Sequence, residues 1–172
     1  MPVQNLQLDH SHHQPSQRLF PLRLLAHDIE MPANVGSLFR IADALGVEEI
    51  HLTGSSVSPP NRKLNKTSRS TEARVRHSYA RDPVVVLREL KAAGYRIVSL
   101  EITRSSIDIR EFVVAASDRI CLVLGSERTG VDQALLELSD DVVHIPMQGG
   151  NSSMNVAMAC AIATFEITGR FD

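Results

Sequence analysis

Apolar residues along the chain alternate between short continuous runs and longer stretches in which they recur every three or four positions. Short runs are typical of strands buried in a sheet, and the wider spacing is typical of helices with one buried face. The two kinds of segment alternate from residue 19 onward. They predict strands at residues 22–26, 49–52, 75–79, 95–102, 120–124 and 142–145, and helices at residues 34–45, 83–93, 131–138 and 153–165.

Residues at the helix boundaries support these assignments. Asn34 is a suitable N-cap for the first helix, and Gly46 follows its last apolar residue, where a left-handed turn would end it. Pro83 suits the first turn of the second helix, and Gly94 closes that helix.

Strands that alternate with helices predict an α/β fold with a mainly parallel sheet and helices on both faces. We expect a single domain over residues 19–172, preceded by a flexible polar tail at residues 1–18. A polar segment at residues 53–72 contains Pro59 and Pro60 and is expected to be a long loop.

Composition narrows the class of protein. Lys and Arg number 18 against 20 for Asp and Glu, so the formal net charge is −2, and the pI is near 6.4. This balance argues against a general polyanion binder but allows a local basic patch. Two cysteines cannot form a disulfide scaffold, and no apolar run is long enough to span a membrane. Because the start lacks a signal-peptide pattern, we expect a cytoplasmic protein.

Several common site motifs are absent or incomplete. Segment 125–130 follows a predicted strand and precedes a helix, as a P-loop does, but Val131 and Asp132 replace the required Lys and Ser/Thr. The chain contains neither G-x-G-x-x-G nor G-x-S-x-G, which disfavours dinucleotide-binding and α/β-hydrolase sites. We expect structural roles for the histidines near strands and for the two cysteines: His51, His77, His144, Cys121 and Cys160.

No metal site is predicted. The histidines of the polar tail could bind a metal ion, but no partner ligands flank them: His10, His12 and His13.

Three glycine-bearing loops remain as candidate site segments, at residues 31–36, 125–130 and 147–155. Each follows a predicted strand, and ligands bind beyond the carboxyl ends of the strands in open parallel sheets. The loops form either one common pocket or three ordinary turns. The last loop precedes an unusually apolar helix at residues 153–165, which Ser152 or Ser153 can cap. A helix that is apolar on nearly every side must be buried all round, and a subunit interface would cover its outer face.

The residues of these loops resemble three motifs of a known family. The segments are Pro32-Ala-Asn34-Val-Gly36-Ser-Leu-Phe-Arg40, Leu122-Val-Leu-Gly125-Ser-Glu127-Arg-Thr-Gly130 and Ile145-Pro-Met-x-Gly149-x-x-x-Ser153-Met-Asn155-Val. In order and spacing they are similar to the motifs of the SpoU/TrmH-type RNA ribose methyltransferases, a branch of the SPOUT class. The resemblance runs from about Leu22 to the C-terminus. It departs from the family pattern at Ser126, where Asn is common, and at Met154, where Leu is common.

The resemblance implies a SPOUT-like α/β fold with a C-terminal trefoil knot, in which the end of the chain threads through a loop. It also implies a homodimer, S-adenosylmethionine as the cofactor, and methyl transfer to a ribose 2′-hydroxyl of tRNA or rRNA. The cofactor would be held mainly by backbone groups of Leu100, Gly125, Ile145 and Met154, with Ser153 as a weaker contact.

The resemblance also places Arg40 at the methyl-transfer step. Because a guanidinium stays protonated, we expect Arg40 to bind a phosphate and stabilise the developing alkoxide rather than act as a base. The alternative is a surface ion pair between Arg40 and Asp43. Asn34 would orient substrate, cap its helix, or do both. Glu127 would hold Arg40, Asn155 or the partner chain, unless it is only a solvated charge, and Asn155 would brace the loops from the first turn of the last helix.

Positive charge that could contact RNA is concentrated in and just after the polar segment 53–72. Six basic residues lie there against a single acidic one, Glu72: Arg62, Lys63, Lys66, Arg69, Arg74 and Arg76. We interpret them as an RNA-contact surface, with a solvated loop as the alternative. Gly36, one helical turn before Arg40, would let an RNA backbone approach closely.

Two other functions stay open at this point. One is a base methyltransferase of the same class, which the presence of Arg40 disfavours. The other is a non-catalytic RNA-binding dimer, which the intact glycine loops disfavour.

Overall fold

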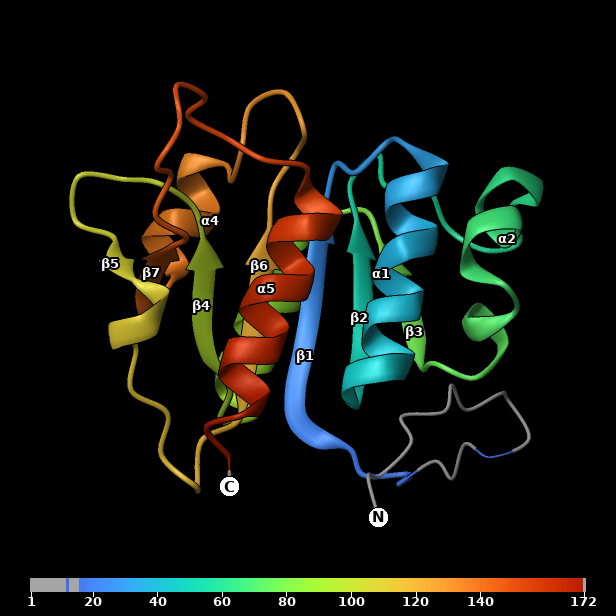
Figure 1. The fold of residues 1–172 in the computed structure, drawn as a ribbon, viewed down its shortest axis with the longest axis horizontal. Helices are drawn as coiled ribbons and strands as arrows, with labels where there is room; N and C mark the ends of the chain where they lie inside the picture. Colours follow the sequence, from blue (N-terminus) through green and yellow to red (C-terminus); the bar gives the residue numbers. More distant parts are fainter. Residues whose placement is uncertain (1–11, 13–15, 172) are drawn as a thin grey trace, which may run out of the picture.

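The computed structural model describes residue 12 and residues 16–171, so most of the predicted tail at residues 1–18 lies outside the described residues. In the described part, strands and helices alternate as the apolar pattern predicts (Figure 1). The elements are β1 (Phe20–His27), α1 (Pro32–Leu45), β2 (Val47–Thr53), α2 (Arg62–Ser68), β3 (His77–Ala80), α3 (Pro83–Ala92), β4 (Arg96–Leu100), β5 (Ile107–Asp108), β6 (Ile120–Leu124), α4 (Gln133–Leu138), β7 (Asp141–His144) and α5 (Val156–Thr168), with short 3₁₀ turns at Thr71–Ala73 and Ile109–Glu111.

The strands of the described chain form one sheet in the order β3-β2-β1-β6-β4-β7-β5, and every neighbouring pair is parallel. The central strand β1 aligns Leu24 with Ile50 of β2 and with Leu122 of β6. Because all pairs are parallel, the carboxyl ends of the strands meet at one edge of the sheet, which is the upper edge in Figure 1. The predicted α/β class with a parallel sheet is confirmed, and the C-terminal knot stays a prediction.

Side chains of the sheet supply two apolar cores, one on each face. Leu24 belongs to the core under α1 and α5, whereas its neighbour Leu25 belongs to the core under α3 and α4. This alternation follows from the two-residue period of a strand. Helices α1 and α5 contact each other on one face of the sheet (Figure 1), and α2 packs against the outer side of α1.

Helix α1 begins two residues earlier than predicted. Pro32 occupies its first turn, where the missing N–H of proline costs no hydrogen bond, and Met31 is the N-cap residue without a side-chain cap. The expectation that Asn34 caps this helix is therefore wrong, because Asn34 lies inside the first turn with its side chain free for other partners. Gly46 ends the helix in the left-handed conformation, with φ of 68°, as predicted.

The polar segment 53–72 is not a continuous loop. Asn61 caps α2 by accepting hydrogen bonds from the backbone N–H groups of Lys63 and Leu64. Helix α2 fills the space beside Gly36, where a Cβ atom would lie 2.8 Å from the Leu64 carbonyl oxygen and 2.8 Å from Cβ of Thr67. The close approach expected of RNA at Gly36 is thus made by α2, and that expectation is wrong.

The last helix is capped by Asn155, whose Oδ1 accepts hydrogen bonds from the N–H groups of Ala157 and Met158, and not by Ser152 or Ser153. Helix α5 is also not buried all round within one chain. Its inner face packs into the core, whereas Met158 is 66% exposed and Phe165 is 70% exposed. No helix among the described residues is long and apolar enough to cross a bilayer.

Candidate active-site cavity

A cavity of about 770 Å³ lies at the carboxyl ends of the strands, and all three predicted loops contribute to its lining. Met31 and Asn34 come from the first loop, residues 125–130 form the second, and residues 152–155 belong to the third. The ends of β4 and β7 complete the wall with residues 100–102 and residues 144–145. The parallel sheet therefore brings the three loops to one pocket, and the alternative of three separate turns is wrong.

A chain of side-chain hydrogen bonds joins the three loops to one another. Nδ2 of Asn34 donates to Oε1 of Glu127 at 2.8 Å, and Oδ1 of Asn34 accepts from Nδ2 of Asn155 at 3.0 Å. Asn34 is only 6% exposed, whereas Glu127 and Asn155 are exposed, so both bonds are partly buried. Asn34 thus uses one donor and one acceptor to hold two other loops in register.

The second loop closes on itself through a short antiparallel bridge. Ser126 and Gly130 exchange two backbone hydrogen bonds of 3.0 Å each. A Cβ atom at Gly125 would lie 2.2 Å from the backbone carbon of Gly130, so only glycine fits this position. The glycine of this motif is needed for the shape of the loop.

Glu101 is a cavity residue that the sequence analysis missed. Its Oε2 accepts from the backbone N–H of Val131 at 2.9 Å, and its Oε1 accepts from that of Ile102 at 2.8 Å. Glu101 therefore anchors the exit of the second loop to the end of β4. The available signal was an acidic residue at the end of an apolar strand. Its two hydrogen-bond partners lie 1 and 30 residues away along the chain, and only folding brings the distant one near.

The structure places every residue expected to contact the cofactor at this cavity. The lining includes Leu100, Gly125, Ile145, Ser153 and Met154. It also includes His144, which the sequence analysis treated as purely structural. Nδ1 of His144 is buried and has no hydrogen-bond partner among the described residues.

Arg40 does not line this cavity. It is exposed on α1, about 9 Å along the helix axis from Asn34, given the 1.5 Å rise per residue. Asp43 pairs instead with Arg74 at 3.1 Å, which contradicts the alternative of an Arg40–Asp43 ion pair. Glu127 takes Asn34 as its partner, so the expected direct contacts of Glu127 with Arg40 or Asn155 are not formed in this chain.

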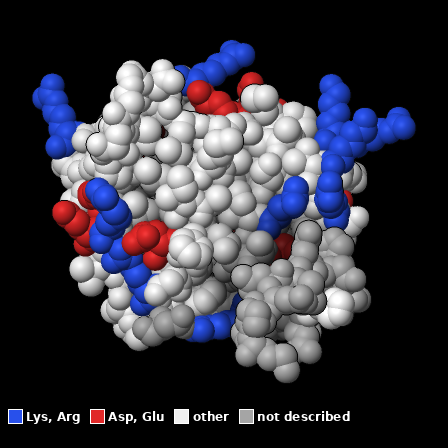
Figure 2. All heavy atoms as spheres, viewed as in Figure 1, with Lys and Arg blue, Asp and Glu red and all other residues white. Residues whose placement is uncertain are grey.

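The six predicted RNA-contact residues are all exposed, but they differ in their surroundings. Arg74 pairs with Asp43, and Arg76 lies 4.0 Å from Glu49. The remaining four lie on or at the end of α2 and are called the α2 basic patch: Arg62, Lys63, Lys66 and Arg69. Figure 2 shows Lys and Arg side chains gathered at the edge where Figure 1 places α2.

The remaining histidines and cysteines have the expected structural settings. Nδ1 of His51 bonds to Ser78 at 2.8 Å, and burial lowers the pKa of His51. The His77 ring packs edge-on against Phe39. Burial raises the pKa of Cys121 and that of Cys160 to about 12, so both stay protonated thiols at neutral pH.

An all-parallel α/β fold with a loop-built cavity at its strand ends has the arrangement in which open parallel sheets bind ligands. The sequence profile of the SpoU rRNA Methylase family matches residues 21–165. The chain therefore belongs to this family.

Relatives agree with this assignment. The chain is 32% identical over 165 residues to the Bacillus subtilis 23S rRNA (guanosine(2553)-2′-O)-methyltransferase RlmP, covering 91% of this chain and 62% of that protein. It is 30% identical over 147 residues to the Escherichia coli tRNA (guanosine(18)-2′-O)-methyltransferase, covering 84% of this chain and 62% of that protein. The chain thus spans less than two thirds of either relative.

A solved structure shows the same fold. It is the SpoU methyltransferase AviRb from Streptomyces viridochromogenes in complex with the cofactor AdoMet. The TM-score is 0.78 at 26% identity, and the match covers 86% of this chain and 59% of that one.

Asn34→Ala should loosen the cavity, because Glu127 and Asn155 would lose their shared partner. We expect the free energy of unfolding to fall by about 1 kcal/mol, the usual net contribution of hydrogen bonds whose remaining partners can bond to water. Urea denaturation measures this loss, and hydrogen exchange should accelerate at residues 126–130. Asn151→Ala removes an exposed amide from the third loop and serves as the control. Equal stability of the two variants would contradict the linking role of Asn34.

Proposed function

We propose that this protein is an S-adenosylmethionine-dependent methyltransferase that acts on a ribose 2′-hydroxyl of tRNA or rRNA. The observation that carries the proposal is the convergence of three family motifs on one cavity, tied together by the Asn34 side chain. Membership of the SpoU rRNA Methylase family and the 2′-O-methyltransferase activities of the named relatives support it.

The residues of the cavity fit this cofactor. A volume of about 770 Å³ lies within the range of small-molecule sites. Apolar side chains of Leu100, Ile145 and Met154 can contact a ring or a thioether chain. When bound, S-adenosylmethionine supplies an electrophilic methyl group on a sulfonium. The chain itself must hold the acceptor oxygen in line with that group and assist loss of its proton.

Arg40 can assist loss of the proton from the acceptor oxygen as a charged group, because a guanidinium donates hydrogen bonds and keeps its own proton. In this role Arg40 binds a phosphate of the RNA and stabilises negative charge on the ribose oxygen. Asn34 and Glu127 act in our proposal by fixing the loop geometry next to α1, and Asn155 braces that geometry from the start of α5. Arg40 lies outside the cavity of its own chain, so this role requires a surface that the RNA or a second subunit completes.

A homodimer is part of the proposal. The outer face of α5 exposes Met158, Ile162 and Phe165, and Met154 lies just before the helix beside the cavity. Figure 2 shows that the centre of the face that α1 and α5 cover is largely free of charged side chains. An exposed apolar helix face with few charges around it is typical of subunit interfaces. We also propose a cytoplasmic location, where tRNA and rRNA are available.

The reaction is tested by incubating the full chain with radiolabelled S-adenosylmethionine and either tRNA or rRNA transcripts, followed by digestion to nucleosides. Label in 2′-O-methylnucleosides supports the proposal, and the transcript that accepts label identifies the RNA class. Label in the bases instead would show a base methyltransferase, and RNA binding without label would show a non-catalytic protein.

Arg40→Ala should lower turnover by about 100-fold or more, because one preorganised charge at a developing oxyanion has an effect of this size. The affinity for S-adenosylmethionine, measured by calorimetry, should change little, since Arg40 does not line the cavity. Arg88→Ala on the opposite face is the control, because Arg88 is also exposed. Equal losses of turnover and cofactor affinity would contradict the assigned role.

Charge reversal in the α2 basic patch should weaken RNA binding and make it less sensitive to salt. For Lys63→Glu with Lys66→Glu we expect the slope of log K against log salt to fall by roughly 1.5, given about 0.7 to 0.9 for each phosphate contact. Filter binding over a range of salt concentrations measures the slope. Arg88→Glu is the control on α3, and an unchanged slope in the α2 variant would place the RNA surface elsewhere.

Phe165→Glu with Met158→Glu should convert a dimer into a monomer, since both side chains lie on the exposed apolar face of α5. Light scattering should report about twice the chain mass of 18.9 kDa for the unaltered protein and a single mass for the variant. Val113→Glu is the matched control, because Val113 is 73% exposed and lies outside α5. A monomeric unaltered protein would refute the dimer.

A further inference from the structure

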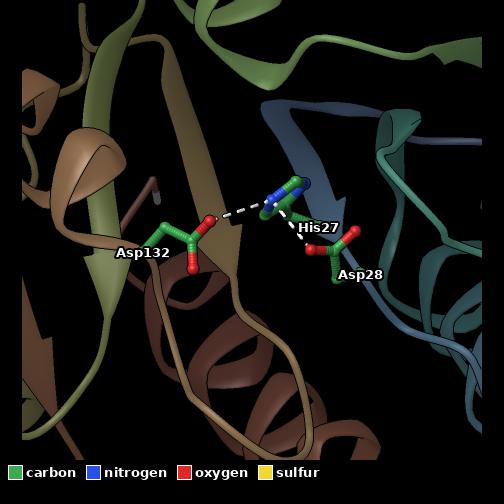
Figure 3. Close-up of side chains that lie close together, drawn as sticks. All are labelled: His27, Asp28 and Asp132. Carbon is green, nitrogen blue, oxygen red and sulfur yellow. Dashed lines mark hydrogen bonds and ion pairs between the residues drawn. The ribbon is translucent and has the colours of Figure 1, made fainter.

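We propose that His27, Asp28 and Asp132 form a binding site for a divalent transition-metal ion of the Zn²⁺ or Mn²⁺ type. The three side chains converge from two separate parts of the chain (Figure 3). His27 ends β1, Asp28 follows it, and Asp132 precedes α4. None of the three lines the cavity of the proposed methyltransferase site, so this inference stands apart from that function.

The donor atoms are spaced as ligands of one ion. Nε2 of His27 lies 3.2 Å from Oδ2 of Asp28 and 3.3 Å from Oδ2 of Asp132. All three ligand atoms lie within 4.8 Å of one another. Metal–nitrogen and metal–oxygen bonds of about 2.0 to 2.2 Å at ordinary coordination angles separate neighbouring donors by roughly 3.0 to 3.5 Å. Both separations from Nε2 of His27 fall in this range.

The buried imidazole is held as the ligand histidines of metal sites are held. His27 is only 6% exposed, and its Nδ1 lies 3.1 Å from the hydroxyl of Thr53. That hydroxyl is also placed to donate its proton to the Ala26 carbonyl oxygen, at 3.4 Å. With the proton directed there, Thr53 accepts from Nδ1–H, and the Nε2 lone pair points at the two carboxylates.

Asp28 is fixed in the same manner. Its Oδ1 accepts from the backbone N–H of Ser55 at 2.7 Å and from the Ser55 hydroxyl at 3.0 Å, which leaves Oδ2 directed at His27. Gly54 makes room for this arrangement, because a Cβ atom there would lie 2.1 Å from Oδ1 of Asp28 and 2.7 Å from Cε1 of His27. Groups outside the cluster therefore orient two of the three ligands, His27 and Asp28.

The charge of the cluster suits a cation. Two carboxylates face an imidazole nitrogen, and within residues 16–171 no Lys or Arg pairs with Asp28 or Asp132. A single Nε2–H proton could not align with both carboxylate oxygens at once, whereas one divalent ion bonds to all three donors and balances two negative charges. A set of one imidazole and two carboxylates, without thiolate, suits Zn²⁺ or Mn²⁺ better than Mg²⁺ or Ca²⁺.

The position of the site gives it a structural consequence. Asp132 follows Val131, whose N–H is held by Glu101 at the cavity wall. A bound ion would therefore fasten the end of β1 to the segment that leaves the second cavity loop. A metal ion here would differ from the sequence-based expectation of no metal site, since the three ligands come from positions 27, 28 and 132 with no motif between them.

The test uses the full chain, stripped of metal with EDTA and purified without a histidine tag. All proteins carry alanine at positions 10, 12 and 13, because the histidines of the N-terminal segment could bind zinc themselves. Calorimetry with ZnCl₂, and electron paramagnetic resonance with MnCl₂, should report one site per chain, and Zn²⁺ should raise the melting temperature. MgCl₂ at the same concentration should bind far more weakly.

Asp132→Asn and His27→Gln should each weaken Zn²⁺ binding by at least about 10-fold, the lower range for disturbing a metal site. Asp132 is half exposed, so its variant is expected to fold and carries the test if the buried His27 variant does not. Glu137→Gln removes an exposed carboxylate one helical turn away and should leave the affinity unchanged. An absence of Zn²⁺ binding, or binding that Asp132→Asn does not alter, would overturn the proposal and leave the three side chains as a hydrogen-bonded cluster without an ion.

Discussion

The side-chain amide of Asn34 is the interaction on which the candidate active site depends. A primary amide offers donors and an acceptor in one plane, and Asn34 uses both kinds to bind Glu127 of one loop and Asn155 of another. Glu127 and Asn155 lie 93 and 121 residues from Asn34 along the chain, so no local interaction could set the spacing of the three loops. Because the Asn34 amide is buried, leaving its own donor or acceptor unpaired would be costly, which favours the arrangement in which Glu127 and Asn155 both bond to it.

The parallel sheet makes this arrangement possible. Every strand of the described chain points the same way, so each strand–loop–helix connection contributes its loop to the same edge. The two apolar cores hold the sheet between α1 and α5 on one face and α3 and α4 on the other. The rigid layers then fix the origins of the loops, and hydrogen bonds from Asn34 and Glu101 fix their ends.

Outside the cavity, the surface divides into regions of different chemistry. The α2 basic patch provides positive charge on a chain that is slightly acidic overall, and the outer face of α5 is apolar. Arg40 is exposed on the helix that contacts both α2 and α5. This position supports our proposal that the RNA or a second subunit completes the reacting site, because Arg40 lies outside the cavity of its own chain.

The sequence by itself determined the class of fold, because apolar periodicity depends only on local spacing. It located the three loops, because glycine is needed where two backbone segments lie very close together, as at Gly125. It also supplied the family motifs that contain Asn34, Glu127 and Asn155. It did not give the partners of these residues, since Asn34 was taken for a helix cap and Glu101 was missed. Only the tertiary structure decided that Gly36 faces α2, that α5 exposes an apolar face, and that His27 meets Asp132. The physical reason is that hydrogen-bond pairing and burial depend on which distant segments the sheet brings together, and local sequence patterns do not record those distances.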